Sequence, residues 1–108
     1  MFGDFGKILK VFGEVKAKLP ELRAKLAQTA FAADAGGGAV SATVMGDLRI
    51  AGLKIKQELL GQTDVEMLED LIKAAVSAAQ AKAIQATKQA MAEITGELNI
   101  PGFDGLLG

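Results

Sequence analysis

Three cationic side chains, Arg49, Lys54 and Lys56, lie close together in a stretch whose apolar residues alternate as they do in a β-strand. Leu53 and Ile55 occupy one face of this strand, so the three cations share the other, outward face. Arginine and lysine grouped on one surface bind phosphate groups by charge neutralisation, which needs no cofactor. The clustering of these cations is a first indication of a phosphate-binding function.

A β-hairpin is predicted to carry these cations. Residues 40–45 alternate apolar and polar side chains, Gly46 and Asp47 turn the chain, and a second strand follows. The alternation slips by one residue at Ala51-Gly52, which predicts a β-bulge that keeps the apolar side chains of both strands on one face. That face is predicted to hold Val40, Ala42, Val44, Leu48, Ile50, Leu53 and Ile55.

A second group of cations flanks an amphipathic N-terminal helix. Its apolar residues follow the alternating 3-4 spacing of a heptad stripe, which is typical of a narrow seam against another helix. The stripe consists of Phe5, Ile8, Phe12, Val15, Leu19, Leu22 and Leu26. The flanking cations are Lys16, Lys18, Arg23 and Lys25. Two interpretations of these cations stay open: a phosphate-binding surface, or a solvated face whose lysine stems shield the seam.

Two features, one within this seam and one after it, predict how the helix continues and where it gives way to strands. Pro20 cannot donate a hydrogen bond to the carbonyl of Lys16, so we expect a kink or a restart of the helix there. Residues 28–33 are predicted to form a first strand, and residues 34–38, which end in three glycines, a turn. The glycines do not suggest a phosphate-binding loop, because no Gly-Lys-Ser/Thr sequence follows them.

A long helix is predicted from Asp64 to about Leu98. Thr63 and Glu66 match a capping box at its start. The acidic residues in the first turns suit the positive end of the helix dipole, and Glu69 has the spacing to pair with Lys73, so we do not interpret them as a metal site.

One face of this long helix is built largely from small residues, which would let another helix approach closely. The face holds Leu68, Ile72, Ala75, Ala79, Ala83, Ala86, Ala90 and Ile94. At about 1.5 Å per residue the helix is roughly 50 Å long, about twice the span of a compact domain of this size. Its far half is therefore expected to project or to pack on another subunit.

The composition excludes several classes of function. Among 108 residues there is no cysteine and no histidine, so disulfides, thiolate sites and imidazole catalysis are all unavailable. We predict no catalytic residues, no cofactor, no metal and no small-molecule substrate. The longest uncharged run, residues 35–46, has 12 residues and is rich in glycine, so it cannot span a bilayer. We expect a cytoplasmic protein without membrane contact.

Charge is divided unevenly along the chain, although the net charge is only -1. Residues 7–56 contain nine basic and four acidic residues, a net of +5, whereas residues 57–108 contain three basic and eight acidic residues, a net of -5. Such a chain can present a basic surface without a basic isoelectric point.

The hairpin joined to the segment Met67-Leu68-Glu69-Asp70-Leu71-Ile72 resembles the YbaB/EbfC family of bacterial nucleoid-associated proteins. The opening Met1-Phe2-Gly3 and the late Pro101-Gly102-Phe103 are similar to the ends of that family. Lys56-Gln57 departs from it, since an Asp-Pro pair is expected there. The resemblance implies an α+β fold with an N-terminal helix, a three-stranded antiparallel β-meander and a long C-terminal helix. It also implies a tweezer-like homodimer that binds DNA in the nucleoid with little sequence preference.

From the residues and the resemblance together we predict a homodimeric DNA-binding protein that contacts phosphates. The alternative is a non-catalytic structural or chaperone-like protein-interaction module, because two long helices joined by a small β element also describe such assemblies. We expect a single domain over residues 1–98 and a flexible C-terminal tail over residues 99–108.

Overall fold

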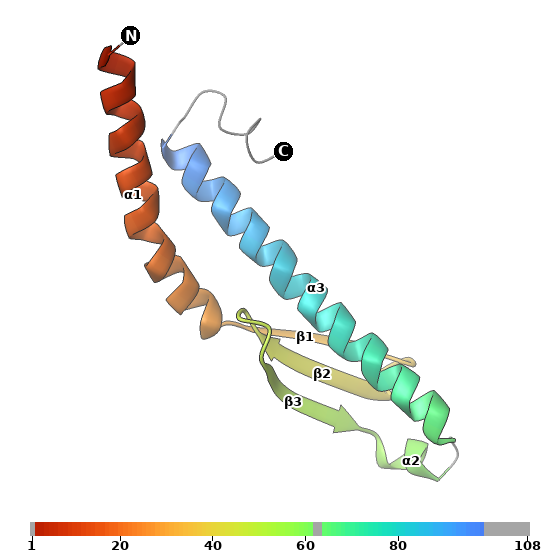
Figure 1. The fold of residues 1–108 in the computed structure, drawn as a ribbon. Coiled ribbons are helices and arrows are strands. Elements are labelled where there is room, and N and C mark those ends of the chain that lie inside the picture. Colours follow the sequence, from red (N-terminus) through yellow and green to blue (C-terminus); the bar gives the residue numbers. More distant parts are fainter. Residues whose placement is uncertain (1, 62–63, 99–108) are drawn as a thin grey trace.

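Three antiparallel strands form a sheet in chain order, and one long helix lies across one face of it (Figure 1). The computed structural model describes residues 2–61 and 64–98. Its elements are α1 (Phe2–Ala27), β1 (Ala30–Ala35), β2 (Val40–Met45), β3 (Ile50–Ile55), α2 (Gln57–Leu60) and α3 (Val65–Leu98). The predicted α+β fold, with an N-terminal helix, a β-meander and a long C-terminal helix, is confirmed. The expected tail, residues 99–108, lies outside the described residues.

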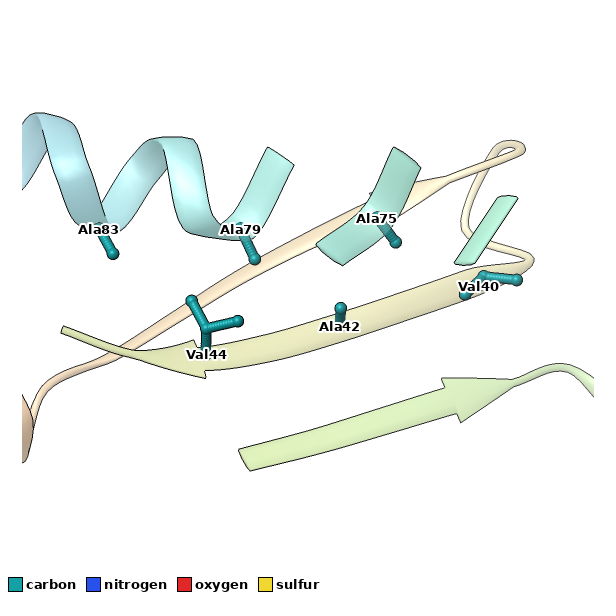
Figure 2. Close-up of a cluster of buried hydrophobic side chains, with 6 residues drawn as sticks. All are labelled: Val40, Ala42, Val44, Ala75, Ala79 and Ala83. Carbon is teal, nitrogen blue, oxygen red and sulfur yellow. The ribbon is translucent and has the colours of Figure 1, made fainter. Parts of the chain in front are cut away.

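The core is a row of small side chains on α3 packed against β2, and α3 runs in the same direction as β2 (Figure 2). The fully buried residues are Val40, Ala42, Val44, Ala75, Ala79 and Ala83. Four residues of a helix rise about 6 Å and two residues of a strand about 6.7 Å, so the three residues of one row stay in step with the three residues of the other. Our expectation that the small face receives another helix is therefore wrong for its central part, where alanine lets the helix approach a sheet.

The predicted β-bulge in the hairpin is confirmed. Val44 pairs with Ile50 but Thr43 pairs with Gly52, which leaves Ala51 as the extra residue of β3. The bulge keeps Ile50, Leu53 and Ile55 on the same face as the buried residues of β2.

Leu48 is not part of the second hairpin strand as predicted, because β3 begins at Ile50 and Leu48 lies in the turn before it with φ of 71°. The turn is closed by a hydrogen bond from the backbone N–H of Leu48 to the carbonyl of Met45, 2.8 Å long. A residue after a type I turn commonly adopts this left-handed conformation in three-residue hairpin loops, where glycine or asparagine is usual.

The first strand begins and ends two residues later than predicted. Asp34 and Ala35 are extended and pair with Ser41 and Val40. Only residues 36–39 make the turn, because three consecutive glycines with φ between 65° and 91° reverse the chain in a short distance.

Pro20 does not restart α1, which is one continuous helix. Its axis changes direction in its C-terminal half (Figure 1), as a proline that lacks a hydrogen bond allows. Pro20 and Lys16 are both exposed, so the carbonyl that loses its partner lies on the solvent side of the helix, where water can bind it.

A close backbone contact joins the end of α1 to the hairpin. The backbone N–H of Gly46 donates to the carbonyl oxygens of Leu26, at 2.9 Å, and of Thr29, at 3.0 Å. A Cβ atom at position 46 would overlap the carbonyl of Leu26. Glycine is therefore required at this joint, which fixes where α1 leaves the sheet.

Asp64 caps the start of α3. Its Oδ1 accepts a hydrogen bond of 2.7 Å from the backbone N–H of Met67, the usual pattern for an N-cap residue. The capping box predicted at Thr63 falls on a position outside the described residues. Nζ of Lys73 lies 3.5 Å from Oδ1 of Asp70, the residue three positions earlier in the helix. This ion pair stands in place of the predicted pairing of Lys73 with Glu69. The short helix α2, which precedes Asp64, was not predicted.

The molecule is elongated because α1 and α3 extend together beyond the sheet (Figure 1). Its principal extents are 70 × 24 × 17 Å and its radius of gyration is 19.7 Å, whereas a compact chain of this length has a radius of about 13 Å. The expectation that the far half of the long helix projects is confirmed.

We predict that Ala79→Leu destabilises the fold by about 1–3 kcal/mol, because the larger side chain must push α3 away from β2. Ala81→Leu is the matched control, since Ala81 is exposed on the same helix. Thermal unfolding followed by circular dichroism measures both. Equal melting temperatures for the two variants would contradict the packing described.

We also predict that Gly46→Ala destabilises by about 1–3 kcal/mol or more, because the new methyl group overlaps the carbonyl of Leu26. Gly52→Ala is the control in the same hairpin, since its new Cβ would meet only Thr43, at 4.0 Å. Chemical denaturation of both proteins should show a loss at position 46 and little change at position 52. An unchanged Gly46→Ala protein would show that α1 is not held at this joint.

Candidate nucleic-acid interface

The three strand cations lie along the face of the sheet opposite α3. Lys54 is directly across from Ser41 on the neighbouring strand. Arg49 lies just before β3 and Lys56 just after it. The alternation of side chains along β3, with its bulge, places all three on the same face. All three are exposed, and they span roughly 20 Å at about 3.3 Å per residue. Over that length one DNA strand presents about six phosphates, since each strand carries one phosphate per 3.4 Å of helix axis. The three cations therefore form an exposed row of charges along β3 and its two ends.

The backbone near Arg49 is held in place by its neighbour. The N–H of Arg49 donates to Oδ1 of Asp47, at 3.1 Å, and the carbonyl of Arg49 accepts from the N–H of Met45, at 2.8 Å. The backbone of Arg49, the first cation of the row, is thus held by two hydrogen bonds in the turn, so its side chain extends from a fixed backbone position.

The four cations predicted on the N-terminal helix do not form one surface. With 3.6 residues per turn, Lys16 and Arg23 lie on one flank of the apolar seam of α1, and Lys18 and Lys25 lie on the other. Lys16, Arg23 and Lys25 are exposed, and Lys18 is half-buried. A single rigid duplex can face one flank at a time.

The joint at Gly46 brings the end of α1 to the start of the strand row. Leu26, whose carbonyl binds Gly46, follows Lys25 in the chain, and Arg49 comes three residues after Gly46. Lys16 lies about 14 Å farther along the helix axis at 1.5 Å per residue. Sequence reasoning did not foresee this proximity, since it depends on a contact between residues 20 positions apart.

The lysines of α3 are partly engaged within the chain. Nζ of Lys82 donates to the carbonyl of Ala32 on β1, at 2.7 Å, and Lys73 pairs with Asp70. Both are therefore less available to an external anion than the cations on β3.

The described residues include neither a candidate metal site nor a membrane-spanning helix. Across residues 2–61 and 64–98 no group of three or more acidic side chains is placed to hold a metal ion. Within the described helices none is long and apolar enough to cross a membrane.

Comparison with known proteins gives consistent matches over nearly the whole chain. The sequence model of the YbaB/EbfC DNA-binding family matches residues 1–98. A nucleoid-associated protein from Clostridium acetobutylicum is 40% identical over 101 residues, which cover 94% of this chain and 90% of that protein. A nucleoid-associated protein from Pelotomaculum thermopropionicum is 38% identical over 103 residues, covering 95% of this chain and 98% of that protein.

A solved structure shares the fold. The crystal structure of an uncharacterized protein from Helicobacter pylori superposes with a TM-score of 0.67 at 22% sequence identity, covering 87% of this chain and 96% of that one.

Proposed function

Since the chain belongs to the YbaB/EbfC DNA-binding family, we propose that it binds duplex DNA as a homodimer, through phosphate contacts and with little preference for base sequence. The observation that carries the proposal is the exposed row of Arg49, Lys54 and Lys56 on a sheet face that no described helix covers (Figure 1). A row of cations on a strand loses less conformational freedom on binding than cations on a fraying helix end.

The outward face of the sheet favours the DNA backbone over the bases. Its described residues include no aromatic side chain, and Phe31 packs on the opposite face against the core. The chain has no tyrosine and no tryptophan. Recognition of bases by stacking on a sheet requires aromatic side chains on that face, so charge neutralisation of phosphates is the mode that remains.

The cations of α1 extend this surface on one flank. A duplex lying along β3 meets α1 near Lys25, at the joint. Because Lys16 and Arg23 lie on the flank away from Lys18 and Lys25, we assign at most one of these pairs to the contact. The other pair is then a solvated face, the second of the two interpretations drawn from the sequence.

Uncovered apolar side chains support the homodimer. Ile50 is 55% exposed and Leu53 43% exposed, although both lie on the core face of the sheet. Helix α3 covers β1 and β2, and Lys82 also binds the backbone of β1, so β3 is the strand left open. A second copy that covers β3 would bury these side chains.

We place the protein at the nucleoid in the cytoplasm and assign it a non-catalytic role. The support is the family and the nucleoid-associated relatives. The tweezer shape follows if two copies join at their sheets, since α1 and α3 of each copy then project as a pair of arms.

A protein-interaction module is the second candidate. It is favoured by exposed apolar residues on the projecting part of α1, where Ile8, Leu9 and Phe12 are about half exposed. A client protein or a partner helix would cover them. DNA binding separates the two candidates, because only the first requires it.

We predict a dimer, so light scattering after gel filtration should give twice 11.2 kDa. Replacing Ile50 and Leu53 together by Gln should shift the mass toward the monomer, because exposing glutamine to water costs less free energy than exposing isoleucine or leucine. Lys54→Gln, on the opposite face, should stay dimeric. A wild-type monomer at micromolar concentration would rule out the homodimer.

We predict that unrelated duplexes bind within a few fold of one another. Log affinity should fall linearly with log salt, with a slope of about -0.9 per phosphate contact. Changing Arg49, Lys54 and Lys56 together to Gln should weaken every duplex alike and make the slope shallower. Lys73 and Lys82 changed to Gln form the control, with little expected loss. Gel-shift titrations across salt concentrations measure all of these.

Three results would count against this model. Undiminished binding by the triple strand variant, together with loss in the Lys73 and Lys82 control, would move the contact to α3. Strong preference for one duplex would refute backbone recognition. No binding even at low salt would favour the protein-interaction module.

A further inference from the structure

The sheet has an outward face that its own helices leave open. Its described positions are Ala30, Ala32 and Asp34 on β1, Ser41, Thr43 and Met45 on β2, and Gly52 and Lys54 on β3. We call this set the outer face. Figure 1 shows α3 on the other side of the sheet and α1 leaving from its end.

Two hydroxyl groups lie at the middle of the outer face. Ser41 stands between Asp34 and Lys54 in one row across the sheet, and Thr43 stands between Ala32 and Gly52 in the next row. Both hydroxyl residues are half-exposed. Ala32 and Gly52, which flank Thr43, have small side chains or none that would project from the sheet. A macromolecule can therefore approach both hydroxyls.

Charge is arranged in one direction across this face. The cations Arg49, Lys54 and Lys56 follow β3, whereas Asp34 lies on β1, about 10 Å from Lys54 at about 4.8 Å per strand. An anion is therefore attracted to β3 and repelled from β1. The hydroxyls of β2 lie between these two edges, one strand away from the cations.

We infer that a DNA phosphate backbone runs along β3 on the outer face and that the hydroxyls of Ser41 and Thr43 donate hydrogen bonds to phosphate oxygens beside the cation row. The inference deepens the proposed function and rests on it. The cations supply the charge neutralisation, and the two hydroxyls position the backbone. Serine and threonine hydroxyls contact phosphates regularly in protein–DNA complexes without carrying sequence information.

The salt dependence of binding tests this inference. Ser41→Ala combined with Thr43→Val should weaken all duplexes alike, by about two- to tenfold for each lost hydrogen bond, and should leave the salt slope unchanged, since a neutral hydroxyl releases no counterion. Lys54→Gln should instead make the slope shallower. Ser77→Ala, at an exposed position on α3, is the matched control and should bind as the wild type does. Valine keeps the shape of threonine in a strand. If the double variant unfolds at a lower temperature than the wild type, Ser41→Ala alone replaces it in the binding measurement.

A second measurement uses the absence of cysteine from the chain. In Ser41→Cys, DNA should slow alkylation of the new thiol by a maleimide several fold, whereas the thiol of Ser77→Cys should react at the same rate with and without DNA. Neither readout depends on the other.

The outcomes separate the inference from the proposed function. If Lys54→Gln loses affinity while the hydroxyl variant binds normally and the thiol at position 41 is not protected, the inference is wrong and the proposed function stands. If the hydroxyl variant changes the salt slope, the hydroxyls do not act as neutral contacts and the inference is overturned. If the wild-type protein does not bind DNA, both are refuted.

Discussion

The packing of three alanines of α3 on three residues of β2 is the interaction on which the rest of the structure depends. Ala75, Ala79 and Ala83 recur every four residues, and their rise nearly equals the rise of alternate residues along β2. Because both rows are small, the helix backbone lies close to the sheet, and all six side chains are fully buried. Larger apolar side chains, among them Phe31, Leu68 and Ile72, pack around this row but stay only partly buried, so the alanine row sets how closely α3 approaches the sheet.

The same contact decides which surfaces remain open. A single helix along β2 covers β1 and β2, and it leaves Ile50 and Leu53 of β3 exposed on the core face. The opposite face of the sheet receives no described helix (Figure 1), so Lys54 of β3 and the flanking Arg49 and Lys56 stay exposed to solvent. One narrow helix on three strands thus separates the apolar surface that we propose a second copy covers from the cationic surface that we propose contacts phosphate.

This arrangement explains the uneven distribution of charge along the chain. The basic first half supplies α1 and β3, which meet at the joint between Leu26 and Gly46. The acidic second half supplies α3, where Asp64 caps the helix and Asp70 pairs with Lys73. The acidic residues serve the helix that builds the core, so a net charge of -1 coexists with a cationic strand.

Local patterns in the sequence determined the hairpin, the bulge at Ala51 and the outward position of Lys54, because side-chain alternation in a strand follows directly from backbone geometry. Only the tertiary structure decided what covers the alanine row, since a small helical face accepts a helix and a sheet equally well. It also decided that α1 continues through Pro20, where the lost hydrogen bond faces water. The contact between the end of α1 and the turn before Arg49 was likewise fixed by the fold, because the hydrogen bond from Gly46 to Leu26 joins residues distant in sequence and leaves no periodic signal.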